Sequence, residues 1–119
     1  MAASEKPANG AKKPAWTFLS NHAHVLVCLA KDPDARLRDV AEMVGITERG
    51  AFRIVGELEE AGVITRLRTG RRNHYELNPH CMLRHPLEGH RSVGGLLALL
   101  LGPEEGKRLG LSSSRARRE

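Results

Sequence analysis

The sequence has few of the features that mark secreted, disulfide-stabilised or membrane proteins. Its two cysteines, Cys28 and Cys81, lie far apart without zinc-ribbon spacing, so both are predicted to be free thiols. No segment approaches the roughly 18 apolar residues of a membrane-spanning helix. The first residues also lack the apolar core of a signal peptide. We therefore expect a soluble, cytoplasmic protein without a membrane partner.

Motifs of catalysis and metal binding are absent as well. The sequence contains no glycine-rich phosphate loop, no Gly-x-Ser-x-Gly motif and no metal-hydrolase motif. His80, His85 and His90 lie near Cys81, but their spacing fits no standard zinc pattern. We expect neither an enzyme nor a cofactor or metal site.

Positive charge is what the sequence has in excess. Its 119 residues suffice for one small domain, and the net charge of +5 favours an anionic partner, nucleic acid first. Residues 1–14 lack periodicity and are predicted to be a disordered leader. Residues 15–101 are predicted to form the domain, and residues 102–119 a basic flexible tail.

Three helices are predicted in the first half of the chain. The first begins at Ser20 or Asn21, ends before Asp32 and is apolar almost all round, which indicates core packing and part of a subunit interface. The second and third have apolar residues at helical spacing and are separated by a tight turn of Gly45, Ile46 and Thr47. Their apolar stripes are Leu37, Val40, Ala41 and Val44, then Ala51, Ile54, Val55 and Leu58.

A basic hairpin follows the third helix. Residues 63–68 and 73–77 alternate like strands, with Val63, Thr65 and Leu67 on one side, and Thr69-Gly70 supplies the turn. Between Gly62 and Tyr75 the sequence has four arginines and no carboxylate. A solvated face normally mixes charges, so this hairpin is predicted to contact an anion.

A leucine-rich helix is predicted near the end of the domain, over about residues 86–101. Its leucines are more than one small domain is expected to cover on a terminal helix, which favours burial against a second copy. They are Leu96, Leu97, Leu99, Leu100 and Leu101. We expect a homodimer formed through the first and C-terminal helices.

This order of elements predicts a mainly α fold with a small β-hairpin wing (α+β), that is, a winged helix-turn-helix with a C-terminal dimerisation helix. The segments LRDVAEMVGITER (37–49), IVGELEEAGVI (54–64) and GRRNHY (70–75) resemble bacterial winged helix-turn-helix regulators of the MarR and ArsR-like type. The resemblance implies a dimeric DNA-binding transcription factor with a recognition helix at 47–61 and a wing at 63–77. Residues 38–43 lack the cysteine pair of many ArsR-type metal sensors.

The candidate base-reading residues lie on the third helix, opposite its apolar stripe. Arg49 and Arg53 are placed one turn apart, where arginine can bond bidentately to guanine. Phe52 could contact a thymine methyl group or pack against the wing or second helix. Thr47 is a helix cap that can also serve a phosphate, and Glu48 could accept from cytosine or stabilise the helix N-terminus.

The wing supplies the candidate backbone contacts. Its arginines are predicted to contact phosphate or the minor groove, with Arg71 and Arg72 at the tip ranking first. The other candidates here are Arg66 and Arg68, together with Asn73, which the resemblance places at the wing. Tyr75 is predicted to be structural, with its ring on the base of the hairpin.

These residues together predict a sequence-specific regulator that binds double-stranded DNA as a dimer on a pseudo-palindromic operator. The alternative is a winged-helix module that binds protein or RNA, because a fold alone does not determine function. The arginines favour DNA, because the core of a protein interface is depleted in charge. Whether a small-molecule effector exists is left open by the sequence.

Overall fold

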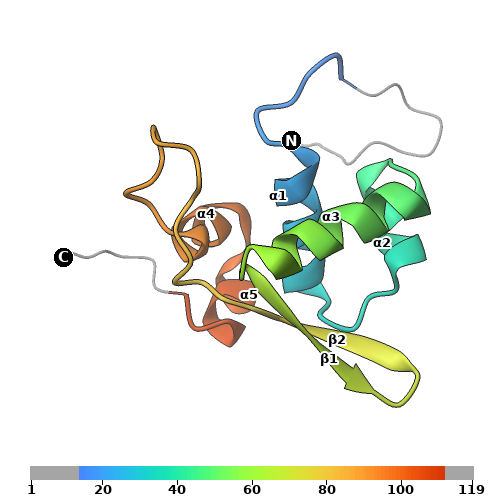
Figure 1. The fold of residues 1–119 in the computed structure, drawn as a ribbon. Coiled ribbons are helices and arrows are strands. Elements are labelled where there is room, and N and C mark those ends of the chain that lie inside the picture. Colours follow the sequence, from blue (N-terminus) through green and yellow to red (C-terminus); the bar gives the residue numbers. More distant parts are fainter. Residues whose placement is uncertain (1–13, 112–119) are drawn as a thin grey trace.

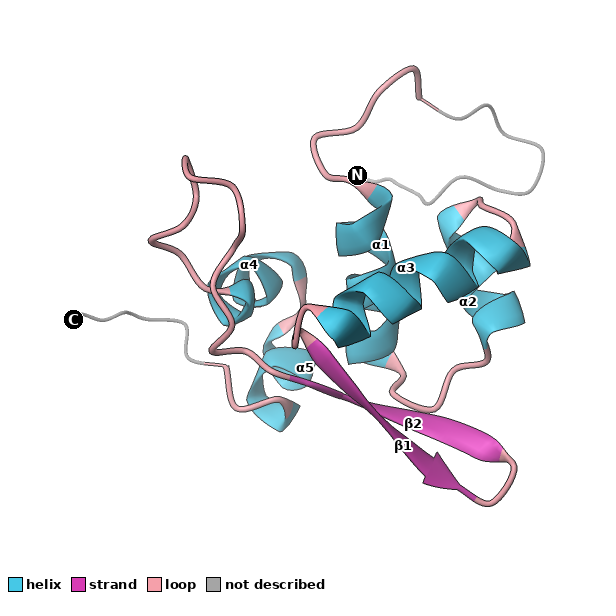
Figure 2. Cartoon of the chain, viewed as in Figure 1, coloured by secondary structure: helices cyan, strands magenta, loops and turns pink. Residues whose placement is uncertain are grey.

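The computed structural model describes residues 14–111, and Figures 1 and 2 show how their helices and strands are arranged. In chain order the elements are α1 (Asn21–Lys31), α2 (Leu37–Val44), α3 (Glu48–Glu60), β1 (Ile64–Thr69), β2 (Arg72–Leu77), α4 (Val93–Leu100) and α5 (Pro103–Arg108). The predicted leader, apart from Pro14, and the last residues of the predicted tail lie outside the described residues. No helix between residues 14 and 111 is long and apolar enough to cross a membrane.

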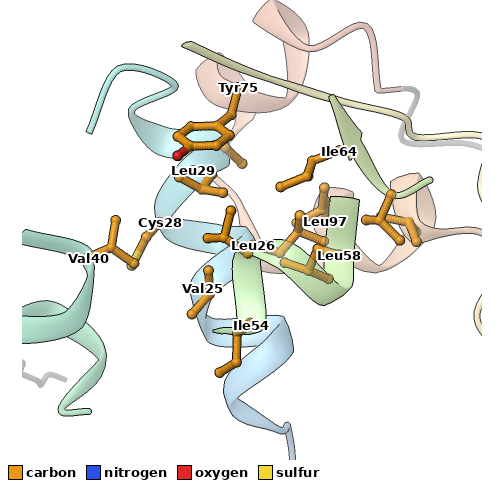
Figure 3. Close-up of a cluster of buried hydrophobic side chains, with 14 of the residues drawn as sticks. Val25, Leu26, Cys28, Leu29, Val40, Ile54, Leu58, Ile64, Tyr75 and Leu97 are labelled. Atoms are coloured by element: carbon orange, nitrogen blue, oxygen red, sulfur yellow. The ribbon is translucent and has the colours of Figure 1, made fainter. Parts of the chain in front are cut away.

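The core forms where α1, α2 and α3 pack together (Figure 3). Val25 and Leu29 of α1 have no exposed surface, and neither has Val40 of α2. All four residues of the apolar stripe predicted for α3 are buried, whereas in α2 only the central pair is. The helical spacing in the sequence therefore predicted correctly which face of each helix points inward.

The turn between α2 and α3 has the predicted construction. Gly45 ends α2 with φ at 91°, a left-handed conformation that glycine adopts without steric cost. Ile46 is half-buried and packs against the core. The Oγ1 of Thr47 accepts a hydrogen bond from the Gly50 N–H at 2.9 Å, which caps α3. These contacts fix the orientation of α3 relative to α2.

Strands β1 and β2 form an antiparallel hairpin whose register pairs Ile64 with Leu77 and Thr69 with Arg72. Gly70 in the connecting turn has φ at 63°. Only the base of the hairpin is packed into the core, through Ile64 and Tyr75, each 2% exposed. Thr65 and Leu67 lie where the hairpin has left the core and are exposed. The hairpin is therefore a projecting wing.

Helix α4 is shorter than predicted, since it begins at Val93 and not near residue 86. Ser92 caps it by accepting a hydrogen bond from the Gly95 N–H at 3.0 Å. The stretch before Ser92 has no apolar residue from Glu88 to Arg91, so a helix there would have no face to bury. It forms a projecting loop instead, in which the Leu83 N–H bonds to the Arg91 carbonyl at 2.9 Å.

The prediction of a flexible tail from residue 102 was wrong for its first part, because Pro103–Arg108 forms α5. Glu105 accepts a hydrogen bond from the Gly102 N–H at 2.9 Å and so begins the helix. Arg108 donates to the carbonyls of Ala30 and Lys31 at 3.0 and 3.2 Å, at the end of α1. An arginine in this place satisfies carbonyls that the last turn of a helix leaves unpaired.

Part of the leucine-rich segment is buried within the single chain, contrary to the prediction that one domain could not cover it. Leu97 and Leu101 are 1% and 7% exposed, whereas Leu99 is 81% and Leu100 38% exposed. Most of α1 is covered as well, because its buried residues contact the core of the same chain. Of the two helices predicted to form the dimer, α4 is the one that keeps a large exposed apolar side chain, Leu99. The predicted fold class, a mainly helical winged helix-turn-helix, is confirmed.

Truncating Leu97 tests whether α4 belongs to this core. We expect Leu97→Ala to lower the free energy of unfolding by about 2–5 kcal/mol, because it leaves a cavity among buried side chains. Leu87→Ala removes the same atoms from a side chain that is 81% exposed and should change stability by about 0.5 kcal/mol or less. Urea unfolding measures both, and equal effects of the two substitutions would mean that α4 does not pack as described.

Candidate nucleic-acid interface

The outward face of α3 bears the residues predicted to read bases. Because Ala51, Ile54, Val55 and Leu58 fix the inner face, Glu48, Arg49, Phe52 and Arg53 are left exposed. Phe52 is 62% exposed. Most of its ring therefore faces solvent, where it could meet a ligand. The side chain of Arg49 has no hydrogen bond or ion pair to any residue of the described range 14–111.

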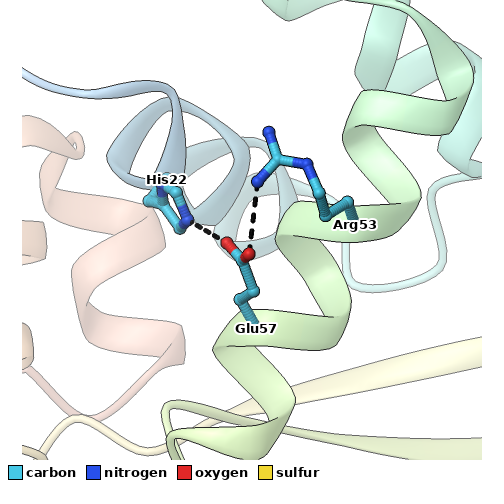
Figure 4. A network of polar contacts seen from close by, with 3 residues as sticks. All are labelled: His22, Arg53 and Glu57. Carbon is cyan, nitrogen blue, oxygen red and sulfur yellow. Dashed lines mark hydrogen bonds and ion pairs between the residues drawn. The ribbon is translucent and has the colours of Figure 1, made fainter.

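Arg53 is not a freely solvated side chain. Its Nη1 lies 3.2 Å from Oε2 of Glu57, and Nε2 of His22 lies 2.7 Å from the other oxygen of the same carboxylate (Figure 4). The network joins the start of α1 to the outward face of α3. Exposed ion pairs of this kind are weak, so this one orients Arg53 without holding it tightly.

The pKa of Glu57 is lowered by this network. The largest cause is the hydrogen bond from His22, and the charge and hydrogen bond of Arg53 lower it further, while desolvation opposes them. A carboxyl group with a lowered pKa in the folded state stabilises the fold at pH values above its ordinary pKa. That stabilisation is lost as the pH falls through the lowered value.

The wing arginines divide into anchored and unanchored side chains. Arg66 lies 3.3 Å from a carboxylate oxygen of Glu59 on α3, and Arg72 donates to the Asp34 carbonyl at 2.8 Å. Arg68 has a long contact of 3.5 Å with the Gly70 carbonyl. Arg71 contacts no hydrogen-bond or ion-pair partner within the described part of the chain. The sequence could not distinguish Arg71 from Arg72. In the structure, Arg72 is bonded to the segment between α1 and α2, whereas the side chain of Arg71 is not bonded within residues 14–111.

Strand β2 is bonded to the segment between α1 and α2, a connection that the sequence analysis missed. The Tyr75 N–H donates to the Pro33 carbonyl at 2.9 Å, and Nδ1 of His74 lies 2.8 Å from a carboxylate oxygen of Asp34. The Arg72 bond ends on the carbonyl of the same Asp34. Asp32-Pro33-Asp34 is a turn signal in the sequence, but no local pattern indicates its partner some forty residues later.

Asn73 and Tyr75 support the wing from inside. Asn73 is half-buried, and its Nδ2 lies 3.5 Å from the Tyr75 hydroxyl. Tyr75 is buried, which confirms the structural role predicted for it. Asn73 therefore lies inward of the exposed wing arginines, on the side where Tyr75 fills the core.

The cysteines and histidines do not gather into a second site. Cys28 is buried beside Met43, with the two sulfur atoms 3.7 Å apart, and burial raises the pKa of its thiol. A raised pKa disfavours the reactive thiolate. Within residues 14–111, no three His, Cys, Asp or Glu side chains are grouped so that they could hold a metal ion.

Comparison with known proteins supports the interpretation of the helical part. Residues 21–65 match a family model described as winged helix-turn-helix DNA-binding. The match covers α1, α2 and α3 and ends just after β1 begins, so the arginine-rich part of the wing lies beyond it. No curated protein and no solved structure matches the chain.

Removing the imidazole of His22 tests the network on α3. We expect His22→Ala to raise the pKa of Glu57 towards its ordinary value of 4.5, because the largest cause of the lowering is lost. His24→Ala is the control, since His24 contacts Asn21 and not Glu57. The side-chain carboxyl carbon of Glu57, followed by NMR against pH, reports the change. An unchanged pKa in His22→Ala would contradict the described contact.

Proposed function

We propose that this protein is a transcriptional regulator that binds double-stranded DNA in a sequence-specific manner. In this proposal α3 enters the major groove as the recognition helix, and the β1–β2 wing holds the DNA backbone. One observation carries the proposal: exposed arginines on α3 adjoin a wing that has four arginines and a single carboxylate, Glu76, on a module that matches a DNA-binding family. In the view of Figure 1, the N-terminal end of α3 and the tip of the wing point towards the same side.

Arg49 is the first candidate for reading a base. Its guanidinium is free of partners in the described residues, and a bidentate bond to guanine contributes about 1–3 kcal/mol of discrimination. Arg53 must leave Glu57 to do the same, and an exposed ion pair is broken at little cost. That cost is smaller than the gain from a base contact, so the Glu57 pair is compatible with base reading by Arg53.

The neighbours of these arginines have secondary roles. Phe52 is exposed and could meet a thymine methyl group in the groove. Thr47 caps α3, and the exposed start of the helix is a favourable place for a phosphate. Glu48 lies in the first turn, where its charge stabilises the helix and could select cytosine.

In the wing, Arg71 is the first candidate for phosphate, because it has no competing partner among residues 14–111. Arg68 is second, since its one contact is long. Arg66 and Arg72 stiffen the wing by bonding to α3 and to the α1–α2 segment, and each keeps further donors for DNA. Asn73 supports the strand through Tyr75.

An alternative is a module that binds protein or RNA. The arginine distribution disfavours it, because an apolar or mixed-charge wing would be expected at a protein interface. The most direct test is selection of bound sites from random double-stranded DNA by the purified protein. Enrichment of one motif supports the proposal, whereas binding without enrichment would leave a non-specific binder. Absence of binding would contradict the proposal.

Substituting Arg49 and Arg71 separately should distinguish base reading from backbone contact. We expect Arg49→Ala to lose about 1–3 kcal/mol on the selected site and to relax its specificity at one position. Arg71→Ala should weaken all sequences alike and reduce the salt slope by about 1.

The control for both substitutions is Arg84→Ala, which removes the same charge from the exposed loop before α4. Fluorescence anisotropy over a range of salt concentrations measures each effect. If Arg49→Ala weakened every sequence equally, Arg49 would not read a base.

We further propose a two-fold homodimer that places two α3 helices in successive major grooves, roughly 10 base pairs apart, on a pseudo-palindrome. The support is the apolar surface of α4, where Leu99 is 81% and Leu100 38% exposed. Such leucines are usually covered by a second copy in a symmetric interface. The first helix can contribute only its half-buried Ala23 and Val27, because its other apolar residues are buried in the core of the single chain.

A charge at Leu99 tests this dimer. We expect Leu99→Glu to sediment as a monomer while its free energy of unfolding, measured at matched dilution, changes by about 0.5 kcal/mol or less. Leu87→Glu is the matched control, because Leu87 is also 81% exposed but lies in the loop before α4. A wild-type protein that sediments as a monomer at micromolar concentration would contradict the dimer.

A further inference from the structure

A hollow of about 340 Å³ opens between the wing and the segment that leads into α2. One wall is the end of that segment, Ala35, Arg36 and Leu37. The other wall is the start of β2, where Arg71, Arg72, Asn73 and Tyr75 line the space. Figure 1 shows the α1–α2 segment running past the hairpin, so residues distant in the sequence form the two walls.

The lining of the hollow is cationic. Arg36, Arg71 and Arg72 belong to it, and none of the seven lining residues is acidic. The guanidinium groups of Arg36 and Arg71 have no hydrogen-bond or ion-pair partner in the described range, and that of Arg72 donates to a carbonyl and to no carboxylate. A guanidinium has five N–H donors, so most of the donors around this space are unpaired. A concave wall of one charge concentrates the field on whatever enters it.

The two walls are held together by bonds that do not involve the unpaired donors. Tyr75 and Pro33 are joined through their backbones at 2.9 Å, and His74 and Asp34 through their side chains at 2.8 Å. The Asp34 carboxylate is therefore engaged by His74 and does not line the hollow. A site that exists before its ligand arrives binds at a smaller entropic cost.

We propose that this hollow is a phosphate-binding site in which Arg36, Arg71 and Arg72 hold one phosphate group. Guanidinium groups match the geometry of phosphate oxygens and bond them with charge assistance. The hollow has room beyond one phosphate, and Ala35, Leu37 and Tyr75 give it an apolar part. That part fits the organic portion of a phosphate ester. The ester belongs either to a free phosphorylated molecule or to a DNA backbone, whose organic portion is the sugar.

The first experiment uses free phosphate and does not depend on the proposed DNA-binding function. Inorganic phosphate and phenyl phosphate are titrated into the full chain at constant ionic strength, and arginine Nε–H signals are followed by NMR. We expect saturable shifts confined to the lining residues. Arg36→Ala should bind about tenfold more weakly, as expected for one lost charge-assisted bond. Arg38→Ala is the control, because Arg38 is exposed on α2 but does not line the hollow.

The second experiment identifies the source of the phosphate and rests on the proposed function. If phosphate displaces DNA from the wild type but not from Arg36→Ala, the free ester and the DNA backbone share the hollow. If phosphate binds without displacing DNA, the ligand is a free phosphorylated molecule. If free phosphate does not bind, yet Arg36→Ala lowers the salt slope of DNA binding by about 1 relative to Arg38→Ala, the DNA backbone is the source.

The proposal is overturned if phosphate causes no saturable shift and Arg36→Ala binds DNA as Arg38→Ala does. A protein that binds phosphate in the hollow but no DNA would contradict the proposed function and leave this site standing. The two failures are therefore distinguishable.

Discussion

The burial of Tyr75 holds the wing in place, and the positions of the exposed arginines depend on it. A two-stranded hairpin is at best marginally stable by itself in water, so this one needs attachment to the helical core. The Tyr75 ring supplies that attachment together with Ile64, and its backbone N–H bonds to Pro33 at 2.9 Å. Because β2 is joined to the α1–α2 segment at this point, the wing, α2 and α3 form one frame.

The exposed arginines of α3 and the wing fall into two groups. Arg66 and Arg72 bond to neighbouring elements and limit the movement of the wing. Arg49 and Arg71 have no such bonds in the described residues and keep all their donors for a ligand. The anchored side chains reduce the conformational entropy that binding would otherwise remove, while the free ones are those proposed to contact the ligand. A count of charges in the sequence cannot separate these roles, because each depends on which carbonyl or carboxylate the fold brings near.

Local patterns predicted the elements that depend on local forces. The apolar stripes of α2 and α3, the Gly45 turn and the Thr47 cap follow from spacing and residue type, and the structure has them. Helix α5 was missed although Pro103 and the two glutamates after it are a start signal, because the segment has little apolar surface of its own. The bonds of Asp34 to the wing join residues some forty positions apart, for which no local signal exists.

The C-terminal helices explain how one small chain can have two surfaces of different chemistry. Arg108 of α5 bonds to the carbonyls of Ala30 and Lys31, so α5 packs against the C-terminal end of α1. In Figure 1 this places α4 and α5 away from the wing tip and the start of α3, and the arginine surface stays uncovered. Leu99 then lies on a separate element from Arg49 and Arg71. A dimer formed through α4 would therefore leave both arginine surfaces free for DNA, as a two-fold helix-turn-helix requires.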